Sequence, residues 1–265
     1  MFQGFNLNID DSFFSNNQPN KNYYKIGKDL YDNNKEQINR NLDDYLGIDG
    51  SLDANKICED WFPNIKSNIF LSHSHNDEDL AIKLSGWLYE NFNLKCFIDS
   101  CVWGYSNDLL KKIDDKYCSS ESTNLYDYNK RNFSTSHIHL MLSTALIRTI
   151  DNTECVFFIN TPNSVEKTSD IISECTYSPW IYSELQATRL LRTRPISDYR
   201  FSPIIEKLAE EYFSNDLKVK YRCSLEHLID LKISDLNNWQ EKYSNYSYLD
   251  QSIHALDVLY KVFEK

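Results

Sequence analysis

The sequence predicts an α/β protein with a parallel sheet, and three observations lead to this class. Residues 68–100 change from a short apolar run to a helical pattern and back to a short apolar run, as a βαβ unit does. The run CVFFIN at 155–160 is apolar without alternation, which is typical of a strand buried on both faces. A helix is expected from Ser178-Pro179, because serine caps helices and proline fits the first helical position.

The chain before this core, residues 1–66, is expected to form a polar arm followed by helices. Its first 30 residues are polar and rich in asparagine, so we expect an irregular arm on the surface rather than a core element. Between 33 and 47, apolar residues recur at every fourth position and a glycine follows, which predicts a helix. Another short helix is expected at 57–62.

The α/β core is expected at 67–195, and the rest of the chain, 196–265, as a mainly helical extension packed on it. Residues 101–135 have no clean period, so we expect a long loop with one short helix at 108–117, followed by a helix from 137. In the extension, Ser202-Pro203 predicts a helix start and HLIDL at 227–231 is strand-like. A last helix is expected to turn Leu256 and Leu259 inward.

Composition and charge limit the classes of function. The 265 residues are 41% hydrophobic and carry a net charge of −11, which disfavours nucleic acids and anionic membranes as partners. The N-terminus lacks the pattern of a secretory signal, and no apolar run approaches the roughly 18 residues of a membrane span. We therefore expect a soluble, cytoplasmic protein. The seven cysteines show no CxxC pair and are expected to be reduced core residues, with a reactive or metal-binding set as the alternative.

Three segments that follow predicted strands could carry chemistry, because ligands of open parallel sheets bind at the carboxyl ends of the strands. The segments are Ser72-His73-Ser74-His75, the stretch from Asp99 to Tyr105, and the loop before Ser178. The first contains no glycine, which argues against a dinucleotide fingerprint and against a P-loop. It offers hydroxyl and imidazole groups that suit a sugar or a phosphate.

Glu184 is the most informative single residue. At about 100° per residue, Trp180, Glu184, Ala187 and Leu191 share one narrow stripe of a helix, which predicts that the carboxylate faces inward. None of its neighbours three or four positions away is a cation. An inward carboxylate needs either a cleft in which it works or a structural partner distant in sequence.

Two His-x-His pairs, SHSH and SHIH, raise the question of a metal site. If the second pair lies on a helix, His137 and His139 diverge by about 200°, and the four imidazoles do not converge simply. Capping or substrate contacts are the alternative, and no metal is expected.

The segments NIFLSHSHNDEDLAIKLSGWL, CFIDSCVWG and SPWIYSEL, in this order and spacing, resemble the Toll/interleukin-1 receptor (TIR) domain, specifically its stand-alone bacterial branch. The first matches the opening strand and helix of the family, the second its second strand and following loop, and the third its helix with a WxxxE arrangement. The likeness covers Ser67 to Leu191. It implies a flavodoxin-like, doubly wound parallel sheet.

The resemblance also implies an activity. Catalytic members cleave NAD+ at the nicotinamide–ribose bond, and their catalytic glutamate maps onto Glu184. NAD+ is then a substrate, and no further cofactor is implied. The substrate-binding residues on this basis are Ser72, His73, Ser74 and Asp99 on the phosphate and ribose side, with Trp103 and Trp180 beside a ring of the substrate, although core packing accounts for Trp180 equally well.

We therefore expect a TIR-type NAD+ glycohydrolase or ADP-ribosyl cyclase of bacterial antiphage defence signalling. Homo-oligomers formed by TIR–TIR contacts and a downstream effector protein are the expected partners. Because the stretch from Cys101 to Ser136 is longer and more polar than a simple TIR loop, the way in which neighbouring subunits complete the site stays open. The alternatives are a non-enzymatic adaptor that acts by TIR–TIR association and a metal-dependent hydrolase that uses the histidines.

Overall fold

The structure is a computed structural model of the whole chain. It describes residues 1–16, 21–35, 45, 52–61, 66–101, 103–119, 125–167, 174–200, 221–222, 224–249 and 252–263. The predicted helix at 33–47 lies largely outside these residues, and the one predicted from Ser202-Pro203 lies wholly outside them.

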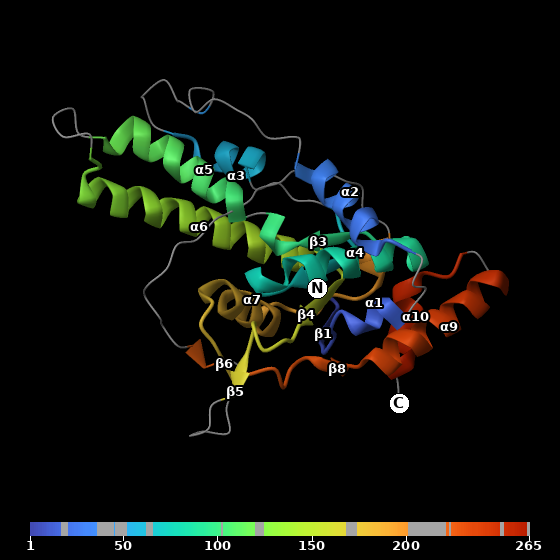
Figure 1. The fold of residues 1–265 in the computed structure, drawn as a ribbon. Coiled ribbons are helices and arrows are strands. Elements are labelled where there is room, and N and C mark those ends of the chain that lie inside the picture. The colour runs from blue at the N-terminus through green and yellow to red at the C-terminus, as the bar shows by residue number, and fades with distance from the viewer. Residues whose placement is uncertain are drawn as a thin grey trace.

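A five-stranded, all-parallel sheet forms the centre of the molecule and confirms the predicted α/β class (Figure 1). Its order is β3-β2-β4-β1-β8, with β1 Gln3–Leu7, β2 Ile69–Ser72, β3 Cys96–Ile98, β4 Cys155–Ile159 and β8 Ile229–Leu231. The expected βαβ unit is β2, α4 (Glu78–Phe92) and β3. β4 is buried along its whole length, as its unbroken apolar run predicts.

The N-terminal segment is not the irregular surface arm that its composition predicts. Residues Gln3–Leu7 form the strand β1, which lies between β4 and β8 and pairs in register from Gln3 with Cys155 to Leu7 with Ile159. Phe5 and Leu7 are wholly buried. The polar Asn6 between them is accommodated because it donates to Asp230 of β8 and accepts from Asn160 after β4. The sheet thus takes strands from the first, middle and last parts of the chain.

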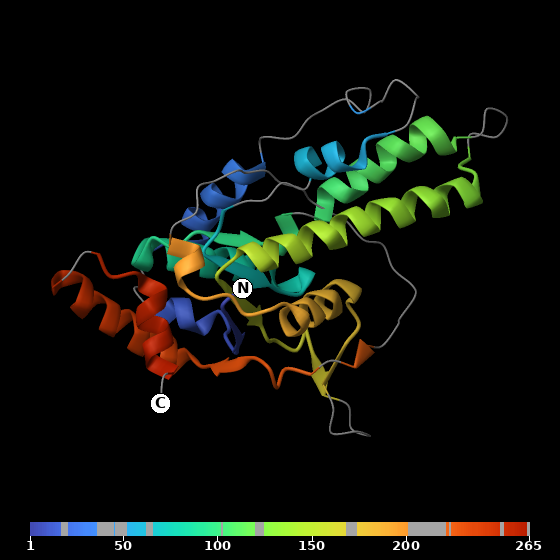
Figure 2. The same ribbon diagram turned by 180° about the vertical axis from the view of Figure 1, so that it is seen from behind.

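Helices cover both faces of the sheet (Figures 1 and 2). On one face, Phe157 of β4 packs against Trp239 of α9 (Ile233–Leu249), and Phe5 packs against Phe263 of α10 (Ala255–Phe263). Neighbouring residues of a strand point to opposite faces, and Phe158 accordingly clusters with Ile181 and Leu185 of α7 (Pro179–Leu190) on the other face. The last helix is buried on its inner side, as predicted.

Two short N-terminal helices, α1 (Ser12–Asn16) and α2 (Tyr23–Lys35), also belong to the core rather than to an arm. Phe13 packs edge-on against Trp87 of α4. α2 approaches α4 so closely that a methyl group on Gly86 would lie 2.0 Å from the backbone carbonyl oxygen of Tyr23, and one on Gly27 would lie 1.9 Å from that of Ile82. Glycine at both positions is therefore what permits this contact.

The predicted long loop at 101–135 is instead mostly helical. A 3-10 turn (Asp99–Cys101), α5 (Trp103–Ile113) and a single π turn (Asp114–Cys118) lead to α6 (Tyr128–Asn152). α6 begins nine residues before the predicted start at 137, because the side chain of Asp127 accepts from the backbone N–H of Lys130 and caps the helix. α5 and the first half of α6 form a hairpin that projects from the sheet, with α3 (Ala54–Trp61) beside it (Figure 1).

The remaining described elements are small. A second, antiparallel sheet contains β5 (Glu166–Lys167), β6 (Glu174–Thr176) and β7 (Tyr221–Arg222), and α8 (Ser197–Arg200) follows α7. Cys96, Cys118, Cys155 and Cys175 are free thiols. Among the helices that the structure describes, none has the length and apolar character to cross a membrane.

Candidate functional site

Four polar side chains that the sequence singles out meet at the carboxyl ends of two adjacent strands. Ser72 is the last residue of β2, His73 follows it, and Asp99 follows β3. Glu184 comes from the second turn of α7, on the face of that helix that packs inward. These four residues are at most 2% exposed, so the cluster that they form is enclosed.

The position of Glu184 follows from a well-defined helix start. Pro179 is the first residue of α7, and the side chain of Ser178 accepts from the backbone N–H of Ile181 at 3.3 Å. With the start fixed, the helical period turns Trp180 and Glu184 inward together, as predicted from sequence. Ser72 then donates from Oγ to Oε2 of Glu184 at 2.6 Å, across 112 positions of sequence.

Asp99 connects Glu184 to His73. Its Oδ1 lies against Nδ1 of His73, and the backbone N–H of His73 points at Oδ2 from 3.4 Å. Complete burial alone would lower the pKa of His73, but the charge and the hydrogen bond of Asp99 outweigh it, so the pKa is raised. Asp99 thus favours the protonated form of His73.

Glu184 is held in its neutral form. Burial raises the pKa of Glu184 well above that of an ordinary glutamate, and the negative charge of Asp99, which also hydrogen bonds to it, raises the pKa further. The hydrogen bond from Ser72 acts in the opposite direction, because it stabilises the ionised form. Two carboxyl groups in contact strongly disfavour ionising together, so the proton stays on Glu184.

The other predicted site residues take different places. Ser74 is nearly buried and stands at the start of the 3-10 turn His75–Asp77, where its carbonyl oxygen accepts from the backbone N–H of Asp77 at 2.7 Å. Trp180 is buried, and its ring meets that of His139 edge-on at 5.6 Å. Trp103 is the first residue of α5, and its side chain lies outside the described part of the structure.

The histidine pairs make separate contacts. His137 lies against the ring of Phe133 at 4.5 Å, whereas His139 lies against Trp180. Their opposite directions on α6 agree with the divergence expected on a helix. Burial lowers the pKa of His139.

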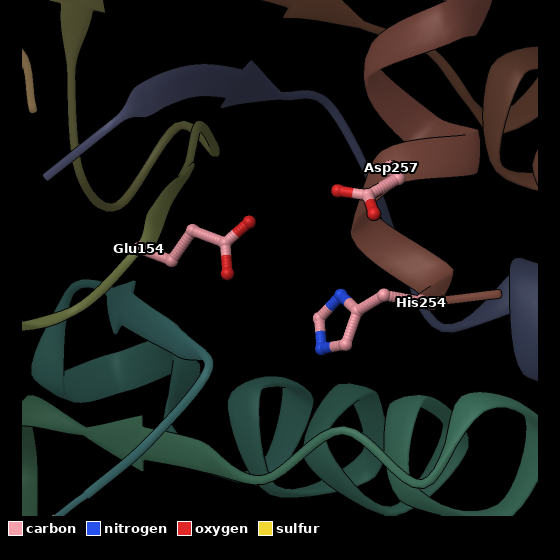
Figure 3. A group of neighbouring side chains, drawn as sticks. All are labelled: Glu154, His254 and Asp257. Carbon is pink, nitrogen blue, oxygen red and sulfur yellow. The ribbon is translucent and has the colours of Figure 1, made fainter. Parts of the chain in front are cut away.

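Glu154, His254 and Asp257 are the one set in the described part of the chain whose side chains are close enough to share a metal ion (Figure 3). Sequence reasoning did not single them out, since they are 100 positions apart and show no ligand spacing. A cation already lies among them, because the guanidinium of Arg200 pairs with both oxygens of Glu154 and with Asp257. Tyr260 also donates to Glu154 at 3.0 Å. The geometry is that of an ion-pair cluster that fastens α8 and α10 to the start of β4.

Sequence reasoning also missed a second polar feature, at the carboxyl edge of the parallel sheet. A cavity of about 650 Å³ opens where β1, β4 and the turn after β2 end. Asp77 lies in its wall and accepts from Thr161 and from Asn163 at 2.8 Å. The only signal in the sequence is the polar TPN that follows CVFFIN.

Comparisons with models of protein families, with curated proteins and with solved structures returned no match for this chain.

Proposed function

We propose that this chain is a TIR-type enzyme that cleaves the nicotinamide–ribose bond of NAD+, with Glu184 as the catalytic carboxylate. The observation that carries the proposal is the enclosed contact of Glu184 with Ser72 and Asp99 at the carboxyl edge of a parallel sheet. A glutamate buried beside another carboxylate does not stabilise a fold, because burial and the like charge both oppose its ionisation. Such strongly perturbed groups are concentrated at functional sites.

The strand order supports a flavodoxin-like, TIR-type arrangement. Counted from β2, the order β3-β2-β4 is 2-1-3, as in the first three positions of the flavodoxin-like order 2-1-3-4-5. β8 occupies the fifth position. The fourth position is filled by β1, from the N-terminus, which is a departure from the usual path of the chain.

The chemistry required of Glu184 is stabilisation of positive charge. Loss of nicotinamide from NAD+ develops an oxocarbenium-like ribosyl cation, which a carboxylate can stabilise while it holds the ribose hydroxyls. The neutral Glu184 of the free protein must ionise for this role. A cationic nicotinamide riboside beside it lowers the cost of ionisation, so substrate binding itself activates the group.

The surrounding residues then act as positioning groups. Ser72 orients the Glu184 carboxylate, and the His73–Asp99 pair fixes the end of β2 against that of β3. We assign Ser74 to the phosphate and ribose side, and Trp180 and Trp103 to a ring of the substrate. Because the cluster is enclosed, we expect activity to depend on an opening that assembly with other copies, or a defence trigger, produces in the cytoplasm.

Incubation of the purified protein with NAD+, followed by chromatography of nicotinamide, tests the proposal. Wild type should release nicotinamide under at least one activating condition, such as high protein concentration, and E184Q should release none. E241Q, which changes an exposed glutamate of α9, is the matched control and should behave as wild type. An E184Q variant as active as wild type overturns the mechanism. The same chromatogram shows whether the product is ADP-ribose or a cyclic form.

The enclosure of Glu184 also favours a second candidate, a non-enzymatic TIR adaptor. At 2% exposure the carboxylate does not reach solvent, as expected of a fold kept for association alone. This candidate predicts concentration-dependent oligomers in light scattering without nicotinamide release at any concentration.

A further inference from the structure

A second cavity lies in the helical hairpin, away from the carboxyl edge of the sheet. It has a volume of about 540 Å³, and its lining comes from α3, the end of α5 with its π turn, and the first half of α6. These helices lie side by side (Figure 1). This volume falls in the range of roughly 300–1,000 Å³ that small-molecule sites occupy.

The interior of this cavity is apolar. Ile57 of α3 and Ile138 of α6 are wholly buried, and Leu52, Ile113 and Met141 complete the walls. Phe133 stands at the mouth and is 69% exposed, so a large aromatic ring is left in water where a ligand could cover it. The walls therefore suit a hydrocarbon chain rather than a sugar or a nucleotide.

One lysine stands among the residues that line the cavity. Lys130 of α6 lines the cavity and is exposed, and His137 follows it seven residues along the same helix. The buried carboxylate nearby, Asp114, is already engaged, because Arg131 pairs with it and Ser134 donates to it. Asp127 is also engaged, since it accepts from the backbone N–H of Lys130. Within the described part of the chain, no carboxylate pairs with the ammonium group of Lys130, which is therefore available to an anion.

We propose that this cavity binds a small anionic amphiphile, with a single alkyl chain in the apolar interior and a carboxylate at Lys130. A medium-chain fatty acid has this chemistry. The proposal does not depend on NAD+ cleavage, since no residue of the cavity belongs to the Glu184 cluster.

Isothermal titration calorimetry of the full chain with sodium decanoate, kept below its micelle concentration, tests the proposal. We expect one molecule bound per chain. The affinity should rise about fourfold for each methylene group from hexanoate to decanoate, which is the equivalent of about 0.8 kcal/mol per buried methylene. Binding that does not depend on chain length overturns the proposal.

Variants separate the role of charge from that of shape. K130A should weaken decanoate by up to about fivefold, the usual limit for an exposed ion pair, and should leave the neutral decanol unchanged. K111A, on the exposed side of α5, is the matched control and should leave both ligands unchanged. Equal binding of decanoate by K130A and wild type contradicts the assignment of the carboxylate to Lys130.

Two more measurements test the fit of the alkyl chain and the physical form of the amphiphile. M141W should fill the cavity and abolish binding of both decanoate and decanol. A melting curve shows whether this variant folds. If the variant does not fold, the comparison of K130A with wild type tests the site instead. Vesicles of phosphatidylcholine with phosphatidylglycerol test a membrane surface as the source of the amphiphile. Binding to vesicles without binding of monomeric decanoate overturns the proposal.

Discussion

Replacing Glu184 by glutamine should stabilise the fold at neutral and alkaline pH. The amide is neutral at every pH, keeps the shape of the side chain, can accept from Ser72 and can donate to Asp99. It therefore reproduces the neutral glutamate that burial and Asp99 impose on the native state. Wild type loses stability as the pH rises, because Glu184 ionises at a lower pH in the unfolded chain than in the folded protein.

The magnitude follows from proton linkage. In the unfolded chain Glu184 has an ordinary pKa of about 4.3, and in the folded protein its pKa is raised. Between the two values the native state binds one more proton than the unfolded state, so the free energy of unfolding falls by about 1.4 kcal/mol per pH unit. The stabilising effect of the neutral group is complete below the unfolded pKa and is lost as the pH rises through the folded pKa.

Urea unfolding of wild type and E184Q at a series of pH values from about 4 to about 9, which spans the range where the linkage acts, measures this difference. The gap between the two free energies should widen with pH and then level off at the folded pKa. The two proteins differ at no other position, so the contributions of the rest of the chain largely cancel in the difference. E241Q controls for the loss of an acidic residue. Parallel profiles for wild type and E184Q would refute the raised pKa and, with it, the enclosed cluster.

Three other changes test separate parts of the structure. Under the proposed cleavage of NAD+, S72A should move the acid limb of kcat/KM to higher pH, because the hydrogen bond from Ser72 lowers the pKa of Glu184. An unmoved limb contradicts this. G86A should lower the urea midpoint, because the added methyl group would lie 2.0 Å from a backbone oxygen of α2. Overpacking of this kind costs about 1–3 kcal/mol of folding stability. Alanine regains only about 1 kcal/mol over glycine through its higher helix propensity. R200A should lower the free energy of unfolding by about 3–5 kcal/mol, because it leaves the buried Glu154 without its cation. R192A, which removes an exposed arginine, is the control and should leave the stability unchanged. Equal urea midpoints for the two variants argue against the ion-pair cluster of Arg200, Glu154 and Asp257.

The local geometry of the candidate site could be predicted from sequence. Ser178-Pro179 determines where α7 starts, and the helical period then requires Glu184 to face inward. The same logic places Ser72 and Asp99 at the ends of neighbouring parallel strands. What the sequence left open was whether Glu184 has a partner, since Ser72 is 112 positions away and only the folded sheet brings the two together.

The errors in the fold share a physical cause. β1 looks like a loop in sequence because Asn6 interrupts its apolar residues, and only the distant Asn160 and Asp230 satisfy the hydrogen bonds of a buried asparagine there. The region 101–135 looks irregular because α5, the π turn and α6 are each stabilised mainly by packing on one another. In both cases, tertiary contacts override a weak local preference.

The arrangement of charges in the cluster accounts for how Glu184 can stay enclosed. The charge of Asp99 raises the pKa of His73, and burial together with the same charge raises the pKa of Glu184. Ionising Glu184 in this closed state would put a second negative charge beside Asp99 and out of water, which the fold resists. Under the proposed function, a substrate group with its own positive charge would remove that cost. The closed cluster therefore favours the neutral form of Glu184 until a positive charge comes near it.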